Sequence, residues 1–138
     1  MMGPGIALTL ASGGLTCTLV SRTPDGAEQG VEKARAQAEL LAREGLMEEA
    51  AAREALGRIA ASAEFDASVA KAALVVESGP EDMAWKRDLF ARMDAVARPD
   101  AVLASNTSGL SITAIGSGCA RPERVLTTHF WNPPHLMP

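Results

Sequence analysis

Two short apolar runs constrain the fold of this chain more than any other feature. Ala72–Val76 and Ala101–Ala104 contain no polar or charged residue, and each is too short for an ordinary helix. A strand that is apolar at every position buries both faces, as the strands of parallel sheets do. The intervening segment Pro80–Ala97 is predicted to be a helix, with Glu81 and Asp82 at the end where carboxylates are favoured. A strand–helix–strand order of this kind predicts parallel pairing through a right-handed crossover.

Helices and strands alternate along most of the remaining chain. Thr23 and Pro24 favour a helix start, because threonine caps free N–H groups and proline is tolerated in the first turn. Gly45 favours the end of that helix. The order predicts an α/β fold with an open, mostly parallel sheet and helices on both faces. The predicted helices are Ile6–Ala11, Pro24–Glu44, Glu48–Leu56, Pro80–Ala97 and Ser111–Ile115, and the predicted strands are Leu15–Val20, Arg58–Ser62, Lys71–Glu77, Ala101–Ala104 and Arg124–Thr128.

Composition excludes several classes of protein. The 138 residues are 47% hydrophobic and carry 13 Lys and Arg against 17 Asp and Glu, a formal net charge of −4. This balance gives no electrostatic footprint for a nucleic acid, and no apolar run reaches the roughly 18 residues of a bilayer-spanning helix. Cys17 and Cys119 are too few for a disulfide framework and predict reduced thiols. We therefore expect one soluble cytoplasmic domain without a nucleic-acid or membrane partner.

A glycine turn opens the chain. Met2–Ala7 reads MGPGIA, which has the spacing of the last part of the dinucleotide fingerprint G-x-G-x-x-G. Gly3 would be the third glycine, which lets the following helix pack closely on a strand, and the phosphates of a dinucleotide bind at the N-terminus of that helix. The first strand and the first two glycines would then lie upstream of residue 1. Taken alone, a Gly-x-Gly segment near an N-terminus is more often a flexible end.

Other segments carry a more specific resemblance. Ala104–Ser108 (ASNTS) and His129–Pro134 (HFWNPP) resemble paired signatures of the L-3-hydroxyacyl-CoA dehydrogenase family, and Leu74–Lys86 resembles its strand-to-helix stretch. The chain is also similar to the lambda-crystallin and L-gulonate dehydrogenase branch. The resemblance implies a Rossmann-like dinucleotide-binding domain over residues 1–138. It further implies that this domain is incomplete, because the first strand is missing, and that the helical domain for substrate binding and dimerisation is absent.

Two polar residues that follow predicted strands are the candidate catalytic groups. Oxidation of an alcohol needs a base for the hydroxyl proton, and histidine exchanges protons near neutral pH. His129 lies at the edge where open α/β sheets bind ligands, and the resemblance makes it the general base. The resemblance gives Ser108 a hydrogen bond to the reacting oxygen. The alternatives are structural: an imidazole hydrogen-bonded in a loop, and a serine that caps a helix or turn. His135 lacks this context and is predicted to be an ordinary loop residue.

The resemblance implies NAD as the cofactor. No metal is expected, because His129, His135 and two distant cysteines do not have the spacing of a zinc site. Where the family has an acidic residue that binds the adenosine ribose, this chain has Ser21 followed by Arg22. Loss of the carboxylate next to a guanidinium favours a 2′-phosphate, so NADP is the alternative cofactor. Glu81 and Lys86 are placed near the cofactor by the resemblance alone; on a helix they would not face each other, and they also suit a solvated surface. The residues predicted to bind the cofactor are Gly3, Gly5, Ser21, Arg22, Glu81, Lys86, Asn106, Ser108 and Asn132.

The function implied by the resemblance is oxidation of the 3-hydroxyl of a 3-hydroxyacyl-CoA to the 3-ketone, in fatty-acid metabolism. The family's Leu-Val-Glu-Val stretch, whose Glu orients the catalytic His, would begin after Pro138. We therefore expect the 138-residue chain alone to be inactive, and a full-length relative to be a homodimer. Two alternatives stay open: a dehydrogenase of a free hydroxy acid or carnitine-like alcohol, and a catalytically dead binding module.

Overall fold

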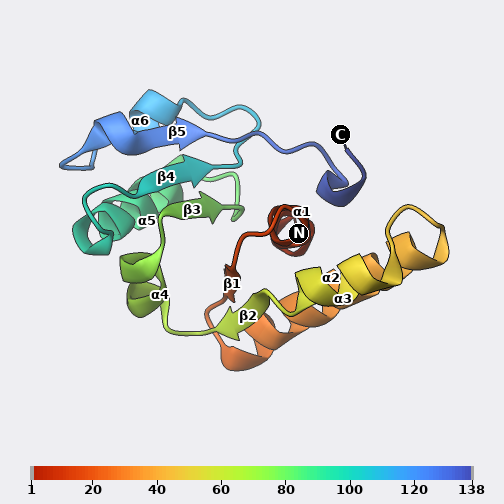
Figure 1. Ribbon diagram of the computed structural model, residues 1–138. Coiled ribbons are helices and arrows are strands. Elements are labelled where there is room, and N and C mark those ends of the chain that lie inside the picture. Colours follow the sequence, from red (N-terminus) through yellow and green to blue (C-terminus); the bar gives the residue numbers. More distant parts are fainter. Residues whose placement is uncertain (1, 138) are drawn as a thin grey trace. The chain divides into compact units, whose positions relative to one another are not determined.

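Every strand pair in the computed structural model is parallel, as the order of predicted helices and strands requires. The structure describes residues 2–137. Their strands form one sheet of two strands and one of three. The two-stranded sheet pairs β1 (Cys17–Val20) with β2 (Ile59–Ser62), and in the three-stranded sheet β4 (Val102–Ser105) lies between β3 (Leu74–Glu77) and β5 (Val125–Thr127) (Figure 1).

The parallel strands with helices between them confirm the α/β class, and the chain folds as two compact units. The N-terminal unit comprises residues 2–65 and 131–137, and the central unit comprises residues 66–130. No helix in the described range combines the length and apolar character of a membrane-spanning segment. The helices of the N-terminal unit are α1 (Gly3–Ser12), α2 (Pro24–Arg43), α3 (Glu49–Leu56) and the 3-10 turn η2 (Pro134–Leu136). Those of the central unit are α4 (Phe65–Lys71), α5 (Met83–Val96), α6 (Ile112–Gly116) and the 3-10 turn η1 (Pro122–Arg124). The first residue of α4, Phe65, still belongs to the N-terminal unit.

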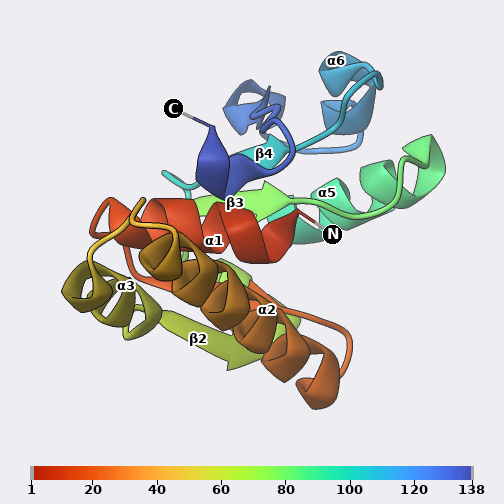
Figure 2. The same cartoon turned by 90° about the vertical axis from the view of Figure 1, so that its right-hand side faces the viewer.

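Small apolar side chains build the core of the N-terminal unit. Ala34 and Ala38 of α2 join Leu8 and Ala11 of α1 in one buried cluster, and all four are fully buried. Alanine lets helices approach closely, and α1 packs directly on α2 (Figure 2). The predicted start of α2 is confirmed, because the Thr23 hydroxyl accepts the N–H of Gly26 at 3.1 Å.

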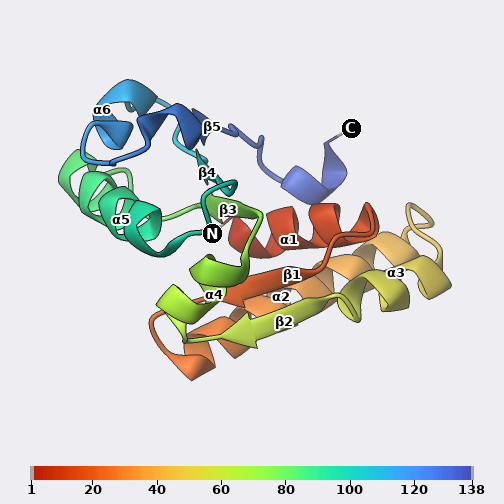
Figure 3. The same ribbon diagram turned by 60° about the vertical axis from the view of Figure 1, so that its left-hand side comes forward.

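The three-stranded sheet holds the central unit together. β4 is buried as predicted, with Leu103 and Ala104 at 0% exposure. The prediction that β3 is buried on both faces is wrong, because Leu74 is 41% exposed. Within the described residues β3 has a partner on one side only, so its first side chain is less covered than those of β4. Helices α5 and α6 pack against each other beside this sheet (Figure 3).

One helix was not predicted. The sequence favours two successive strands between residues 58 and 77, whereas the structure places α4 between β2 and β3. Only Val69 of α4 is buried, so the segment lacks the apolar periodicity by which longer helices are recognised. Its charges are a weaker signal: Asp66 lies in the first turn and Lys71 in the last, as the helix dipole favours.

Candidate active site

The loops that carry Ser108 and His129 start side by side. β4 and β5 are parallel neighbours, and Ser105 at the end of β4 is in register with Thr127 at the end of β5. Ser108 follows three residues after the end of β4, and His129 follows two after the end of β5. Both side chains are exposed. The structure therefore places both candidate catalytic residues on loops at one carboxyl edge of the sheet, as their positions after predicted strands indicate.

The residues on either side of His129 are tied to the end of β4. The N–H of Thr128 donates to the carbonyl of Ser105 at 3.0 Å. The N–H of Phe130 donates to Oδ1 of Asn106 at 2.7 Å. The neighbours of His129 on both sides are thus held by hydrogen bonds, while His129 itself is exposed. Asn106, predicted to bind the cofactor, has the observed task of fixing this loop.

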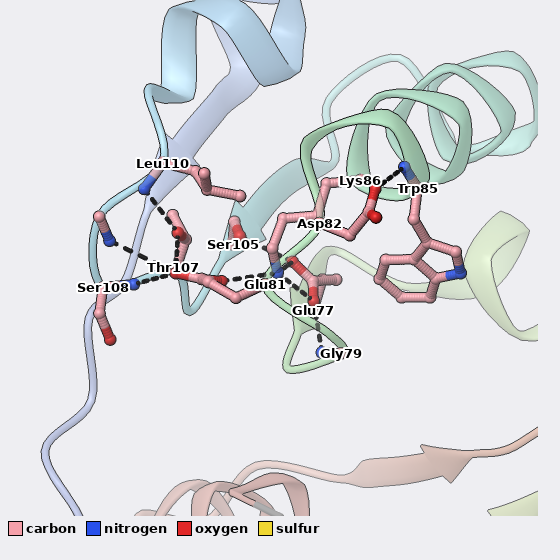
Figure 4. Close-up of polar contacts among 11 residues, drawn as sticks. Glu77, Gly79, Glu81, Asp82, Trp85, Lys86, Ser105, Thr107, Ser108 and Leu110 are labelled. Carbon is pink, nitrogen blue, oxygen red and sulfur yellow. Dashed lines mark hydrogen bonds and ion pairs between the residues drawn. The ribbon is translucent and has the colours of Figure 1, made fainter.

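The Ser108 turn is organised around the Glu81 carboxylate. Oε1 of Glu81 accepts the Thr107 hydroxyl at 2.6 Å, the N–H of Ser108 at 2.8 Å and the N–H of Gly109 at 3.4 Å (Figure 4). The Ser108 side chain points away from Glu81. Because Ser111 is the N-cap of α6, the helix-capping alternative does not apply to Ser108. The hydrogen bond from Thr107 lowers the pKa of Glu81 most; the N–H of Ser108, the Lys86 charge and the N–H of Gly109 lower it further.

A buried ion pair lies beneath this turn. Nζ of Lys86 lies 2.7 Å from both carboxylate oxygens of Glu77, and the two side chains are 1% and 3% exposed. Oε2 of Glu77 also accepts the Ser105 hydroxyl at 2.7 Å, and Oε1 accepts the N–H of Gly79. Nζ of Lys86 reaches Oε2 of Glu81 at 3.5 Å. One connected network therefore links β3, α5 and the end of β4.

The expectation that Glu81 and Lys86 do not face each other is wrong. It assumed that both lie on one helix, but α5 begins only at Met83, with Asp82 as its N-cap. Glu81 therefore lies in the loop before the helix and can turn towards Lys86. Whether either residue contacts a cofactor stays a prediction.

The glycine turn forms the start of α1 in the N-terminal unit. The helix begins at Gly3, and Met2 caps it without a side-chain hydrogen bond. A Cβ at Gly3 would lie 3.8 Å from Leu19, an ordinary contact with β1. A Cβ at Gly5 would lie 2.7 Å from Cγ of Pro134 and 3.1 Å from Nδ1 of His135. Gly5 thus allows η2 to pack on α1, and His135 is part of that packing.

Ser21 and Arg22 follow β1 and lead into α2. Gly26 leaves room for two hydroxyls here, because a Cβ on it would lie 2.6 Å from Oγ of Ser21 and 3.0 Å from Oγ1 of Thr23. Both hydroxyls therefore lie at the first turn of α2, next to the exposed Arg22. Asn132, also exposed, belongs to the same unit.

The predicted site residues are divided between the two units. Glu81, Lys86, Asn106, Ser108 and His129 lie in the central unit, and the first four take part in the hydrogen bonds just described. Gly3, Gly5, Ser21, Arg22 and Asn132 lie in the N-terminal unit. Across residues 2–137 no three His, Cys, Asp or Glu side chains gather as metal ligands would.

Sequence reasoning assigned no role to Glu77 or Ser105. Their contact joins residues 28 positions apart, and no spacing rule identifies such a pair. A partial signal is present, however. Glu77 ends an apolar run, and a carboxylate buried at such a position needs a cation or hydrogen-bond donors.

Comparison with known families gives a match over the whole chain. The family described as "3-hydroxyacyl-CoA dehydrogenase, NAD binding domain" matches residues 1–138. A probable 3-hydroxybutyryl-CoA dehydrogenase of Bacillus subtilis is 35% identical over 136 residues, which cover 99% of this chain and 47% of that protein. An L-carnitine dehydrogenase of Streptomyces coelicolor is 42% identical over 81 residues, or 59% of this chain and 26% of that protein.

Solved structures agree with this match. The crystal structure of 3-hydroxybutyryl-CoA dehydrogenase from Escherichia coli has a TM-score of 0.92 at 32% identity, with 99% of this chain and 29% of that chain covered. The chain spans about half the length or less of the relatives it matches.

Proposed function

The chain belongs to the family of 3-hydroxyacyl-CoA dehydrogenase NAD-binding domains, and from that premise we propose that it is the dinucleotide-binding part of such a dehydrogenase. The whole enzyme would oxidise the 3-hydroxyl of a 3-hydroxyacyl-CoA to the 3-ketone. The observation that carries the proposal is the pairing of the β4 and β5 ends, which brings the loops of Ser108 and His129 to one edge of the sheet. A cytoplasmic, homodimeric whole protein stays a prediction.

In this proposal His129 and Ser108 divide the work on the hydroxyl group. An imidazole nitrogen of His129 takes the hydroxyl proton as the alcohol is oxidised, and returns it in the reverse reaction. The Ser108 hydroxyl donates a hydrogen bond to the same oxygen, which Glu81 leaves possible because it engages the Ser108 backbone only. NAD, when bound, supplies the acceptor for the hydride from the carbon that bears the hydroxyl.

The donors of the N-terminal unit fit a dinucleotide. The first N–H groups of a helix have no acceptor within the helix and form an anion site. In α1 this first turn contains Gly3 and Gly5, and the side chain of the N-cap residue Met2 does not hydrogen-bond to it. We propose that these amides hold the diphosphate, and that Asn132 lies on the nicotinamide side.

We propose that Ser21 and Arg22 shift cofactor preference towards NADP. The two hydroxyls at the first turn of α2 and the exposed guanidinium of Arg22 are hydrogen-bond donors. Donors and positive charge suit a 2′-phosphate, whereas a ribose with a free 2′-hydroxyl is usually bound by a carboxylate.

A titration of the chain with NADH and with NADPH tests both points. We expect saturable binding and a raised Tm, with stabilisation of about 2.7 kcal/mol at 100 times Kd. Arg22→Ala should weaken NADPH binding about tenfold and leave NADH binding nearly unchanged, because one charge-assisted hydrogen bond is worth about 1.5 kcal/mol or more. Arg43→Ala, at the other end of α2, is the matched control.

Each outcome separates the alternatives. If neither nucleotide binds, the chain is a binding module without this cofactor and the proposal fails. A strong preference for NADH would overturn the role of Arg22 alone. Little or no turnover of 3-hydroxybutyryl-CoA is expected from the 138-residue chain, and measurable turnover would contradict that expectation.

A second substrate class has its own support. The match to an L-carnitine dehydrogenase favours a small hydroxy acid or carnitine-like alcohol as the alternative substrate. Both reactions use the same base and hydride acceptor, so this part of the protein serves either. Assays of the whole enzyme with L-carnitine and with 3-hydroxybutyryl-CoA would distinguish them.

A further inference from the structure

Glu77 is a densely bonded carboxylate of the central unit. It is 3% exposed and receives four donor contacts: Nζ of Lys86 at 2.7 Å from each oxygen, the hydroxyl of Ser105 at 2.7 Å, and the N–H of Gly79. Its position at the end of β3 places these bonds at the same edge of the sheet as the catalytic loops (Figure 4).

One branch of contacts runs from Glu77 to Ser108. Lys86 neutralises Glu77 and extends the same ammonium group towards Glu81, 3.5 Å away. Glu81 in turn accepts the N–H of Ser108 at 2.8 Å. The ammonium group of Lys86 thus faces two carboxylates, one buried and one half-exposed, and it holds Oε2 of Glu81 while Oε1 binds the Ser108 turn.

A second branch runs from Glu77 to the His129 loop. The Ser105 hydroxyl donates to Glu77, and the Ser105 carbonyl accepts the N–H of Thr128 at 3.0 Å. The backbone carbonyl of Glu77 accepts the N–H of Asn106 at 2.8 Å, and Oδ1 of Asn106 accepts the N–H of Phe130. Both neighbours of His129 are therefore bonded to residues that Glu77 holds.

The other buried ion pair of this unit serves as an internal comparison. Asp94 and Arg124 are also nearly fully buried, and Nη2 of Arg124 lies 2.6 Å from Oδ1 of Asp94. Oδ1 of Asp94 also accepts a hydrogen bond from Nε of Arg124 at 2.8 Å and lies 3.5 Å from Nε of Arg121, and Oδ2 accepts the N–H groups of Ala120 and Arg121, before η1. This pair fastens α5 to the start of β5 but touches neither catalytic loop. Burial of a carboxylate alone therefore does not explain why the contacts of Glu77 lead to the two catalytic loops.

We propose that Glu77 is a positioning residue that sets the Ser108 turn and the His129 loop together, through Lys86 and Glu81 on one side and through Ser105 and Asn106 on the other. The role rests on the proposed dehydrogenase function. Glu77 itself would touch neither cofactor nor substrate. A directional network suits this task, because hydrogen bonds fix orientation and apolar contacts do not.

Amide hydrogen exchange of the whole chain, without cofactor, tests the network. Glu77→Gln keeps the shape of the side chain but leaves Lys86 without its main carboxylate. We expect the N–H of Ser108 to exchange about tenfold faster, relative to interior amides of α5, as loss of a charge-assisted hydrogen bond implies. Asp94→Asn, the matched buried control, should leave this ratio unchanged even where it lowers global stability.

NADH titration of the same variants connects the network to function. We expect Glu77→Gln to bind NADH several-fold more weakly and Asp94→Asn to bind as the wild type does. If the exchange rate of the Ser108 N–H relative to the α5 amides is unchanged in Glu77→Gln, the inference is overturned and the proposed function stands. Failure of the wild type to bind NADH overturns the proposed function and, with it, this role of Glu77.

A second variant covers the case in which Glu77→Gln does not fold. Glu77→Gln combined with Lys86→Met removes both charges, and such replacements of a buried pair often preserve the fold. Glu81 then loses its link to Lys86, so the Ser108 ratio should rise about tenfold in this variant as well. Equal exchange in the double variant and the wild type would overturn the proposal.

Discussion

The two units of the chain are held together in different ways. The large buried cluster of the N-terminal unit is made of alanine, leucine and isoleucine. The central unit contains every buried polar or charged side chain found among the described residues. These are Glu77, Lys86, Asp94, Ser105, Thr107 and Arg124.

In the proposed function each unit has different groups to hold in place. Apolar packing is non-directional, and it suffices to set helix α1 on its strands so that the backbone amides of its first turn are presented. Side chains that act on a proton need defined orientations, and hydrogen bonds depend steeply on angle. The loops of Ser108 and His129 are accordingly fixed by hydrogen bonds that their backbone N–H groups donate to Glu81, Ser105 and Asn106.

Removal of a buried charge from the central unit should have the largest effect. Asp94→Ala leaves the Arg124 guanidinium buried without its carboxylate and leaves the N–H groups of Ala120 and Arg121 without their acceptor. Breaking a buried pair in this way costs about 3–5 kcal/mol. Urea unfolding monitored by the fluorescence of Trp85, in a Trp131→Phe background, would measure the loss.

The counterpart in the N-terminal unit is Leu8→Ala. Leu8 is fully buried among alanines, and truncation of such a side chain costs about 2–5 kcal/mol. Trp131, in a Trp85→Phe background, reports on this unit. If either substitution lowers the urea midpoints reported by Trp85 and Trp131 equally, the two units unfold together. The stabilities of the two units could then not be compared separately.

The N-terminal unit was the more predictable of the two from sequence. The apolar period of α2 predicts a buried side made of Val31, Ala34, Ala38, Leu41 and Ala42. Ala34, Ala38 and Leu41 are buried, whereas Val31 and Ala42 are only partly buried. The cap at Thr23 and the helix end at Gly45, which has φ +70°, follow from local chemistry. Local patterns succeed here because alanine packing leaves a periodic trace in the sequence.

The central unit was predictable in outline only. The strand ends locate Ser108 and His129, because ligand loops follow the carboxyl ends of parallel strands. The hydrogen bonds that hold these loops join residues such as Glu81 and Ser108, which are 27 positions apart. No periodicity specifies which of many charged residues form such a pair, so the network appears only in three dimensions.

Acidification should destabilise the central unit more than the N-terminal unit, and this effect is expected to be smaller than those of the two core substitutions. Burial raises the pKa of Asp94, but hydrogen bonds and charge from Arg124, with the N–H groups of Ala120 and Arg121, outweigh this and lower the pKa overall. The pKa of Glu81 is also lowered. A carboxyl with a lowered folded-state pKa stabilises the fold above its unfolded pKa, about 4, and this contribution is lost as pH falls through the folded-state value.

The fluorescence of Trp85 should therefore change at a higher pH than that of Trp131 when the chain is titrated from pH 6 to pH 2. The alanine, leucine and isoleucine of the N-terminal cluster do not titrate. Asp94→Asn removes one of the two carboxyls and should flatten the acid dependence seen by Trp85. If Trp85 and Trp131 change at the same pH while Asp94 is present, the carboxyls of the central unit do not cause the acid sensitivity.

The smallest expected effect compares one helix cap in each unit. The Thr23 hydroxyl accepts the N–H of Gly26 at 3.1 Å, and the Asp82 carboxylate accepts that of Trp85 at 2.8 Å. Alanine at either cap should cost about 1 kcal/mol, measured by thermal unfolding. The two should differ at Ser108, because Asp82 adjoins Glu81, whose carboxylate holds the Ser108 N–H. Asp82→Ala should therefore speed exchange of that amide while Thr23→Ala does not. Equal exchange in both variants would mean that Glu81 keeps its place without the cap, through its contacts with Thr107 and Lys86.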